Sequence, residues 1–332
     1  MDTLLVYYAI SEESKKKLLD QDIRPLIFPV EIPWRSDGWQ LLNDAPAAQL
    51  SDCTMMIGNA LAADEALLTR APNLKWIHSP MAGLSTGNGG GVDWRLMEKH
   101  GIAITPSKIH EHNISEMIVG MMLALSKDFL FFRAQQQAHS YAAERTTHML
   151  FGKTVLIIGT GNIGAATAAK LHDAFHMRVL GLNTAGRAVE GFDATAPFSA
   201  LAQWLPQADY VVLACPYTEK THHLLDGEAL AQMKPSAYLI NIARGQVVEQ
   251  DALLHALNTG RIAGAALDVF ETEPVPENDP LWDTPNLLMT PHVAGNMEGY
   301  ADAVVDAFLR NLPAFRAGRP EEMPNYANIK KY

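Results

Sequence analysis

One glycine-rich stretch constrains the fold of this chain more than any other feature of its sequence. It reads Gly159-Thr160-Gly161-Asn162-Ile163-Gly164, follows the apolar run at residues 155–158 and precedes a helix-forming run at residues 165–171. In a strand–turn–helix unit the first glycine permits the tight turn, the second admits a pyrophosphate and the third lets the helix pack on the strand. The helix N-terminus then attracts the phosphates. The stretch therefore predicts a dinucleotide site in a doubly wound α/β fold.

Short apolar runs alternate with helix-length segments along the rest of the chain, a pattern typical of parallel sheets covered by helices. Before the glycine-rich stretch we expect strands at residues 4–8, 55–58, 76–78 and 103–106. From the stretch onward we expect six strands, at residues 154–158, 178–182, 210–213, 237–242, 264–267 and 287–289. One long helix is expected at residues 113–143, and its methionine stripe indicates a core or a subunit interface.

Length and charge exclude several classes of protein. The chain has 332 residues, which fits two domains of about 150 residues each. A net charge of −11 argues against nucleic acid, because binding to a phosphate backbone relies on surplus lysine and arginine. No apolar run approaches the ~18 residues that span a bilayer, and the N-terminus does not resemble a signal peptide. With only Cys53 and Cys215, we expect a cytoplasmic protein without disulfides, membrane contact or a metal site.

The residues after the second strand of the dinucleotide unit bear on the choice of cofactor. Enzymes that use NAD usually carry Asp or Glu about 20 residues after the glycine-rich stretch, where the carboxylate binds the ribose hydroxyls. This chain has Asn183 there, followed by Thr184 and, four residues after Asn183, Arg187. Asn183 lacks the negative charge with which an acidic residue would repel a 2′-phosphate. Thr184 can donate a hydrogen bond to such a phosphate, and Arg187 supplies positive charge. The sequence therefore favours NADP over NAD and leaves NAD open.

Three polar residues that each follow an apolar run form a candidate catalytic set: Arg244, Glu273 and His292. The carboxyl ends of neighbouring parallel strands open on one crevice, so these residues can converge. A planar guanidinium can bind a 2-oxo acid with two parallel hydrogen bonds. A histidine can protonate the carbonyl oxygen as hydride reaches the carbon, and a neighbouring carboxylate favours the charged imidazolium. We expect Arg244 to hold the substrate, His292 to donate the proton and Glu273 to orient the histidine.

Together these segments resemble the D-isomer-specific 2-hydroxyacid dehydrogenase family, which includes glyoxylate/hydroxypyruvate reductases, phosphoglycerate dehydrogenase and D-lactate dehydrogenase. The resemblance covers about residues 75–300. Besides the glycine-rich stretch, it is carried by Pro216-Tyr217-Thr218-Glu219-Lys220-Thr221, Met233-Lys234-Pro235, Asn241-Ile242-Ala243-Arg244-Gly245, Gly264-Ala265-Ala266-Leu267-Asp268-Val269-Phe270, Glu273-Pro274, Pro280-Leu281-Trp282 and Thr290-Pro291-His292.

The resemblance implies hydride transfer from NAD(P)H to a 2-oxo acid to give the D-2-hydroxy acid. It implies a Rossmann cofactor domain at residues 105–295, a flavodoxin-like substrate domain at residues 1–104 and 296–332, and a homodimer formed through the cofactor domain. The expected substrate-binding residues are Met81, Ala82 and Gly83, through their backbone amides, with Arg244 and His292. The expected cofactor-binding residues are Gly159, Thr160, Gly161, Asn162, Ile163, Gly164, Asn183, Thr184, Arg187, Cys215, Pro216, Thr221, Ala243 and Asp268, the last at the nicotinamide carboxamide.

Several alternatives remain open at the level of sequence. The glycine-rich loop at residues 85–91 is either a surface loop or an extension of the substrate loop. Cys215 is interpreted either as a buried thiol or as part of the cofactor crevice. A nucleotide-sensing, corepressor-like binding protein of the same fold is the alternative function. A formate dehydrogenase would not need Glu273 to keep a histidine charged. The side chain of the 2-oxo acid is not determined.

Overall fold

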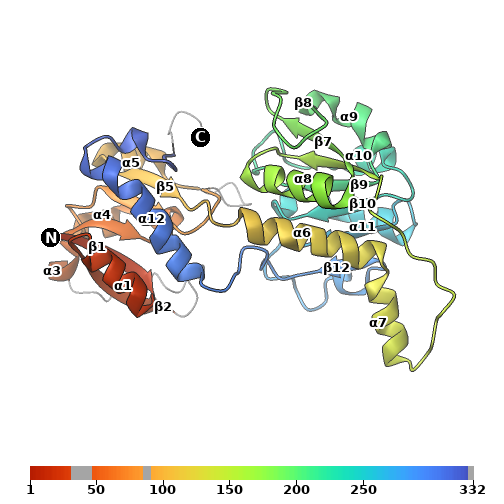
Figure 1. Ribbon diagram of the computed structural model, residues 1–332, viewed down its shortest axis with the longest axis horizontal. Coiled ribbons are helices and arrows are strands. Elements are labelled where there is room, and N and C mark those ends of the chain that lie inside the picture. The colour runs from red at the N-terminus through yellow and green to blue at the C-terminus, as the bar shows by residue number, and fades with distance from the viewer. Residues whose placement is uncertain (31–46, 85–90, 328–332) are drawn as a thin grey trace. The chain divides into compact units, whose positions relative to one another are not determined.

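The computed structural model describes residues 1–30, 47–84 and 91–327 and divides the chain into two units, each built on a parallel sheet (Figure 1). Unit 1 comprises Met1–His110 and Met297–Tyr332, and unit 2 comprises Glu111–Asn296. The sequence-based expectation set the borders after residues 104 and 295. Both units follow the doubly wound α/β plan that the glycine-rich stretch predicts.

Unit 1 contains a five-stranded parallel sheet in the order β2-β1-β3-β4-β5, which is the flavodoxin-like order. Its strands are β1 (Asp2–Tyr8), β2 (Ile23–Val30), β3 (Cys53–Ile57), β4 (Trp76–Ser79) and β5 (Ala103–Pro106). The sequence did not predict β2, which contains Pro25 and Pro29. It lies at the edge of the sheet, where a missing N–H costs least, so the prolines are tolerated.

The helices of unit 1 pack on this sheet around one apolar core. They are α1 (Glu12–Leu19), α3 (Ala47–Leu50), α4 (Glu65–Arg70), α5 (Trp94–His100) and α12 (Tyr300–Arg316), which returns from the far end of the chain. The Phe308 ring of α12 stacks on Trp76 of β4 at 4.4 Å between centroids. The side chain of Asp302 accepts hydrogen bonds from the Ser11 amide at 3.1 Å and the Ser14 hydroxyl at 2.6 Å. These contacts fix α12, and with it Tyr300, against the sheet.

Unit 2 contains a seven-stranded parallel sheet in the order β12-β11-β10-β9-β6-β7-β8. The order reverses beside β6, as in dinucleotide-binding sheets. Its strands are β6 (Thr154–Ile158), β7 (Arg178–Asn183), β8 (Ala194–Pro197), β9 (Tyr210–Leu213), β10 (Tyr238–Asn241), β11 (Gly264–Leu267) and β12 (Leu287–Met289). Six were predicted. The seventh, β8, is a four-residue edge strand without a buried side chain, so no apolar run marks it.

Two apolar clusters cover the faces of this sheet. The helices of unit 2 are α6 (Glu111–Ser126), α7 (Phe129–Gln137), α8 (Asn162–Phe175), α9 (Leu201–Trp204), α10 (Gly227–Gln232) and α11 (Gln250–Asn258). The methionine stripe of α6 is core: Ile118, Met121 and Met122 are buried against β-strand residues.

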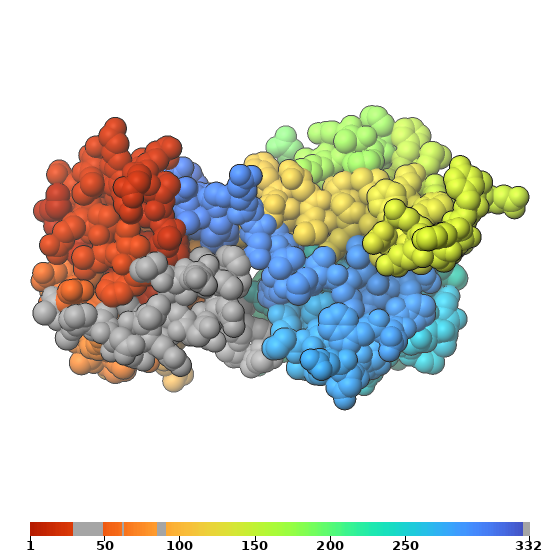
Figure 2. Space-filling view, turned by 90° about the horizontal axis from the view of Figure 1, so that it is seen from below, coloured from red at the N-terminus to blue at the C-terminus, as the bar shows by residue number. Residues whose placement is uncertain are grey.

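The prediction of a single helix at residues 113–143 was wrong. Asp128 adopts a left-handed conformation with φ 53°, and this ends α6 and redirects the chain into α7. Asp tolerates that conformation better than most residues, and the Asp128 carboxylate accepts a hydrogen bond from Arg145 Nε at 2.6 Å. No residue of α7 is buried, and Figures 1 and 2 show its segment projecting from unit 2. Among the described helices, none has the length and apolar character needed to cross a bilayer.

Candidate functional site

The glycine-rich stretch forms the turn between β6 and α8, where its three glycines meet different surroundings. Gly159 has φ +106°, and a Cβ there would lie 2.5 Å from the carbonyl oxygen of Ala214. A Cβ on Gly164 would overlap the carbonyl oxygen of Gly159. A Cβ on Gly161 would meet no atom within 4 Å. Two glycines therefore let backbone pack on backbone, while the third leaves space open at the start of α8.

That open space suits a diphosphate. Gly161 is the N-cap of the 14-residue helix α8, and no side chain caps this end. The first N–H groups of a helix lack intrahelical partners and carry a partial positive charge. Thr160, Asn162 and Ile163 are exposed or half-buried around the turn. The residues present therefore fit the pyrophosphate of a dinucleotide, which the turn would hold through its backbone amides.

Asn183 at the end of β7 uses both ends of its amide to hold the following loop. Its Nδ2 donates to Thr160 Oγ1 at 3.2 Å and to the Arg187 carbonyl at 2.8 Å. Its Oδ1 accepts from the amides of Ala185 at 3.2 Å and Arg187 at 3.0 Å. Aspartate could accept from the same amides but could not donate, so the loop itself gives a reason for asparagine. Thr184 and the Arg187 side chain are exposed beside it.

The segment after β9 is held by one hydroxyl. Thr221 Oγ1 donates to the Pro216 carbonyl at 2.9 Å and accepts from the Thr218 amide at 2.7 Å. Cys215 is buried where β9 ends, and burial raises the pKa of its thiol to about 12. The thiol is therefore protonated and inert, which favours the buried-thiol interpretation.

The end of β10 is shaped by Asn241, a residue to which no specific role was assigned from its sequence pattern. This buried side chain accepts from the Ala243 amide and donates to the Arg244 carbonyl, both at 3.0 Å. The Arg244 guanidinium donates to the Ala243 carbonyl at 2.7 Å. A Cβ on Gly245 would overlap the backbone of Phe270 in the next loop. The backbone after Arg244 therefore lies directly against the segment that leads to Glu273.

Asp268, just after β11, holds the loop that carries His292. Its buried carboxylate accepts hydrogen bonds from the Thr290 hydroxyl at 2.6 Å and from the amides of Val293 at 2.9 Å and Ala294 at 3.0 Å. Its carbonyl accepts from the His292 amide at 2.8 Å. His292 has φ 53°, a conformation that costs a non-glycine residue about 1–3 kcal/mol. These bonds hold the histidine in that conformation, a role the sequence did not reveal.

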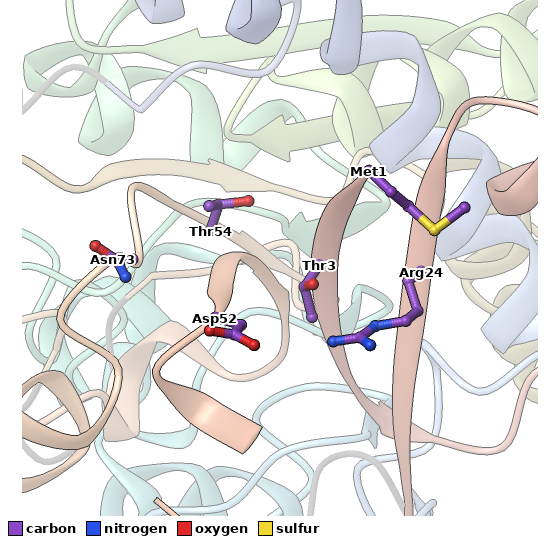
Figure 3. A pocket seen from close by; sticks show the side chains of 6 residues that line it. All are labelled: Met1, Thr3, Arg24, Asp52, Thr54 and Asn73. Atoms are coloured by element: carbon purple, nitrogen blue, oxygen red, sulfur yellow. The ribbon is translucent and has the colours of Figure 1, made fainter. Parts of the chain in front are cut away.

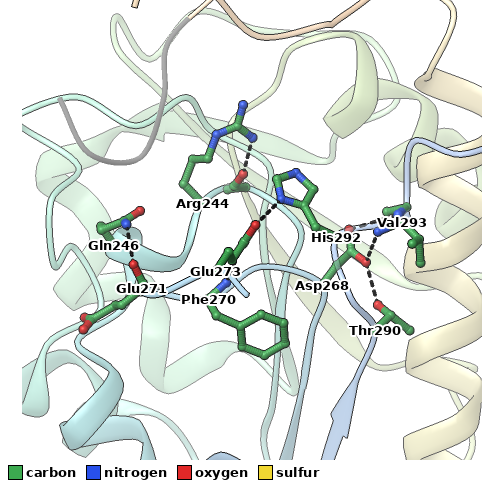
Figure 4. A network of polar contacts seen from close by, with 11 residues as sticks. Arg244, Gln246, Asp268, Phe270, Glu271, Glu273, Thr290, His292 and Val293 are labelled. Atoms are coloured by element: carbon green, nitrogen blue, oxygen red, sulfur yellow. Dashed lines mark hydrogen bonds and ion pairs between the residues drawn. The ribbon is translucent and has the colours of Figure 1, made fainter. Parts of the chain in front are cut away.

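His292 and Glu273 form a close pair at this edge of the sheet (Figure 4). His292 Nδ1 lies 2.6 Å from Glu273 Oε2, and the other carboxylate oxygen accepts from the Phe270 amide at 2.9 Å. Figure 4 shows one ring nitrogen of His292 facing Glu273 and the other turned away from it. The His292 side chain is 47% exposed, so Nε2 is available to a ligand.

The charges of this cluster support one another. Burial by itself would raise the pKa of Glu273, but hydrogen bonds from His292 and Phe270 and the charges of His292 and Arg244 bring its pKa below the ordinary value. Burial lowers the pKa of Arg244, and the negative charge of Glu273 opposes that shift. Guanidinium remains protonated in proteins. The structure thus brings together all three predicted catalytic residues, with both His292 and Arg244 acting on the Glu273 carboxylate.

A second histidine–glutamate pair lies beside the first and was missed by the sequence analysis. His223 Nε2 lies 3.0 Å from Glu271 Oε1, which also accepts from the Gln250 amide at 3.2 Å. Gln246 Nε2 donates to the Glu271 carbonyl at 2.9 Å. The pair ties the segment after β9 to the segment that carries Glu273. His223 follows no apolar run, and Glu271, which lies two residues before Glu273 in the same segment, was assigned no role from the sequence.

The predicted substrate loop lies in unit 1, directly after β4. Ala82 is exposed there, while Met81 and Gly83 are half-buried. Residues 85–90 lie outside the described residues, so the interpretation of that glycine-rich segment stays open.

A cavity of about 390 Å³ in unit 1 contains none of the predicted residues, and Figure 3 shows the side chains that line it. It is lined by Met1, Thr3, Arg24, Asp52, Thr54 and Asn73. These residues lie at the amino ends of β1, β2 and β3 and just before β4. Ligands of parallel α/β sheets bind at the carboxyl ends, so this cavity is not the candidate site. Among residues 1–30, 47–84 and 91–327, no three His, Cys, Asp or Glu side chains are grouped to hold a metal.

Comparisons with known proteins agree with this geometry. Residues 119–294 match the family described as D-isomer specific 2-hydroxyacid dehydrogenase, NAD binding domain. The glyoxylate/hydroxypyruvate reductase B of Pectobacterium carotovorum is 34% identical over 284 residues, 84% of this chain and 87% of that protein. A D-isomer specific 2-hydroxyacid dehydrogenase family protein from Aeromonas salmonicida has 31% identity and TM-score 0.78, with 99% of each chain covered. A homologous structure from Xanthobacter autotrophicus, in complex with NADPH and MES, has 25% identity and TM-score 0.78, with 99% of each chain covered.

The second and third glycines of the stretch, Gly161 and Gly164, predict opposite mutant behaviour. We expect Gly161→Ala to fold normally, because φ −73° is open to alanine and its Cβ would meet no protein atom. The same Cβ would occupy the space beside the diphosphate, so the Kd for NADPH should rise about tenfold or more. Gly164→Ala should instead lower the unfolding temperature, because its Cβ overlaps a carbonyl oxygen.

NADPH fluorescence titration and thermal unfolding separate these outcomes. Gly120→Ala is the matched control, since a Cβ there also meets nothing within 4 Å but lies on α6. An unchanged NADPH Kd in Gly161→Ala would show that the diphosphate does not bind at this turn.

Proposed function

Because the chain belongs to the D-isomer-specific 2-hydroxyacid dehydrogenase family, we propose how its own residues carry out NAD(P)H-dependent reduction of a 2-oxo acid. The chain is an oxidoreductase of this type, and the named relatives do not favour the corepressor-like alternative. The observation that carries the proposal is the 2.6 Å contact between His292 Nδ1 and Glu273 Oε2, with Arg244 in the same electrostatic cluster. The proposed cofactor site lies in unit 2, and the proposed substrate loop lies in unit 1.

His292 is the proton donor of the proposed mechanism. The nicotinamide, when bound, supplies the hydride that reaches the carbonyl carbon. Glu273 accepts the Nδ1 proton of His292 in a hydrogen bond and stabilises the imidazolium. Nε2 then carries the proton that passes to the developing alkoxide oxygen. Asp268 keeps the ring in place by holding the loop from Thr290 to Ala294.

Arg244 is the substrate-binding cation of the proposed mechanism. Its guanidinium is partly buried at the end of β10, and a charge in such a place is strongly attracted to an anion that replaces its lost hydration. A 2-oxo acid offers a carboxylate and a carbonyl oxygen, which a planar guanidinium can bind side by side. Polarisation of the carbonyl by Arg244 also stabilises the negative charge that develops on its oxygen.

Removal of the proposed proton donor, His292, should lower turnover strongly while NADPH binding stays unchanged. We expect His292→Asn to lower kcat/KM for 2-oxo acid reduction by about 10²–10⁴, the contribution of general acid catalysis. The NADPH Kd should stay within about twofold of the wild type, because His292 lies away from the α8 turn. Near wild-type turnover in this variant would remove His292 from the mechanism. The same assay of Glu273→Gln should show lower activity and a changed dependence on pH at the acid end.

The pH dependence on the acid side should also change. The pKa of Glu273 lies below its ordinary value, so its carboxylate is ionised throughout the neutral range and loses its charge only as pH falls through that lowered pKa. Wild-type activity should decline there, because the protonated carboxyl no longer stabilises a charged proton donor. Glutamine has no carboxyl to protonate, so this acid-side decline should be absent from Glu273→Gln. Glu277→Gln is the matched control, because Glu277 is an exposed glutamate four residues after Glu273 and makes no hydrogen bond to His292 among the described residues.

NADPH is the proposed preferred cofactor. The support is the exposed Arg187 beside the end of β7, together with the absence of an acidic residue at Asn183. The bonds of Asn183 provide an independent structural reason for that residue, so the weight of the proposal falls on Arg187. The homologous structure from Xanthobacter autotrophicus holds NADPH. For the substrate, the named Pectobacterium relative makes glyoxylate and hydroxypyruvate the first 2-oxo acids to assay.

Arg187→Ala should discriminate between the two cofactors. We expect the KM for NADPH to rise about five- to tenfold, because a charge-assisted hydrogen bond to the 2′-phosphate is lost. The KM for NADH should change less than about twofold. Arg178→Ala, at the opposite end of β7, is the control. A wild-type enzyme that prefers NADH across a panel of 2-oxo acids would contradict the proposed preference.

We also propose that the chain forms a homodimer through unit 2. Large apolar side chains of unit 2 lie in water: on α7, Phe129 is 57% and the adjacent Leu130 39% exposed, and in the segment before β6, Met149 and Phe151 are 63% and 64% exposed. No side chain of α7 is buried. Adjacent large apolar side chains left in water, such as Phe129 and Leu130, support an interaction site on α7.

A charge placed on this surface should separate the protomers. Phe129→Asp combined with Leu130→Asp is expected to convert a dimer into a monomer by light scattering after size-exclusion chromatography, because two carboxylates would be desolvated in the interface. Leu19→Asp, an exposed apolar residue on α1 in unit 1, should leave the dimer intact. A monomeric wild type, or a dimeric double variant, would refute this interface.

A further inference from the structure

The loop after β4 holds three consecutive carbonyl groups in place with donors from the rest of unit 1. The Ser107 amide donates to the Ser79 carbonyl at 2.8 Å and to the Met81 carbonyl at 3.2 Å. The carbonyl between them, that of Pro80, accepts from the Tyr300 hydroxyl at 2.8 Å. Tyr300 begins α12, more than two hundred residues along the chain, and nothing in the proposed mechanism uses it.

These carbonyl contacts decide where the amides of the loop point. In a planar trans peptide the C=O of one residue and the N–H of the next lie on opposite sides. The Pro80 carbonyl turned to Tyr300 therefore aims the Met81 amide away from Tyr300. The Met81 carbonyl turned to Ser107 likewise aims the Ala82 amide away from Ser107. Ala82 is exposed, and the Met81 amide makes only a long 3.4 Å contact with Ser79 Oγ.

Both donors are themselves held in place. His110 Nε2 lies 3.3 Å from the Tyr300 hydroxyl, and the two rings are 5.6 Å apart between centroids. Because the Tyr300 hydroxyl donates its hydrogen bond to the Pro80 carbonyl, its oxygen can accept a hydrogen bond from His110. Burial raises the pKa of Tyr300, so the hydroxyl remains a donor at any physiological pH.

On the other side, Ser107 Oγ lies 2.9 Å from Nε2 of His78, a fully buried ring whose pKa burial lowers to about 3. The Nδ1 of His78 lies 2.7 Å from the Thr105 hydroxyl, which also accepts from Trp76. This neutral, fully bonded histidine fixes the residue whose amide holds the loop.

We propose that Tyr300 is a positioning residue for substrate binding: its hydroxyl fixes the Pro80 carbonyl and thereby presents the Met81 and Ala82 amides to the substrate carboxylate. This inference rests on the proposed function, because it takes the loop after β4 as the carboxylate-binding loop. Two fixed amides bind an anion better than two mobile ones, since less order has to be created on binding. Tyr300 acts through the loop backbone and does not itself touch the substrate.

Tyr300→Phe tests the inference, since it keeps the ring and removes only the hydroxyl. With saturating NADPH, the KM for glyoxylate should rise about tenfold. The kcat should change less than about twofold, because the carboxylate is bound equally in the ground state and the transition state. The Ki of oxalate, which offers the same carboxylate group, should rise by the same factor as the KM.

Tyr326→Phe is the matched control. Tyr326 is a half-buried tyrosine that packs on the core of the same unit and makes no side-chain hydrogen bond among the described residues, so removal of its hydroxyl should leave the glyoxylate KM unchanged. Equal KM values in Tyr300→Phe and the wild type would overturn the inference. So would a Tyr300→Phe variant whose kcat, NADPH Kd and unfolding temperature fall together, because that pattern indicates a merely structural role. If the wild type itself reduces no 2-oxo acid in a panel that includes glyoxylate and hydroxypyruvate, the proposed function fails instead.

Discussion

The buried carboxylate of Asp268 is the interaction on which the candidate site depends. Three hydrogen bonds, from Thr290, Val293 and Ala294, converge on it, and its own carbonyl accepts from the His292 amide. A buried charge is stable only when it is fully hydrogen-bonded, so the loop and the carboxylate need each other. The histidine remains in a left-handed conformation because these surrounding bonds outweigh its local strain.

Close backbone contacts then set the distances between segments from different strands. Glycine at 164 lets α8 pack on the turn after β6, and glycine at 245 lets the segment after Arg244 lie on the backbone of Phe270. Any side chain at either place would overlap main-chain atoms that cannot move without disturbing a strand. The second contact brings the guanidinium of Arg244 and the carboxylate of Glu273, which belong to neighbouring strands, into one electrostatic cluster.

Features that depend on a local sequence pattern were predicted correctly. Features that depend on a single residue or on a tertiary contact were missed. Buried strands such as β6 and β9 are continuous apolar runs and were placed correctly. The edge strands β2 and β8 were missed because prolines and exposed side chains hide them. The break at Asp128 depends on one left-handed residue within a helix-forming sequence. Arg244, Glu273 and His292 could be named because each follows a strand, whereas Asn241 and Tyr300 act through backbone carbonyls that no sequence pattern displays.

Two histidine–glutamate pairs stand almost side by side in this chain, and their surroundings give them different capacities. The Glu271 oxygen that faces His223 also accepts a hydrogen bond from the Gln250 amide, and this second bond ties the pair to the first turn of α11. Glu273 divides its oxygens, one to the Phe270 amide and one to His292 alone. The first pair therefore joins two segments of backbone, while the second leaves the ring of His292 at an exposed edge of the sheet. Residue type is the same in both, so chemistry is assigned here by what else each carboxylate binds.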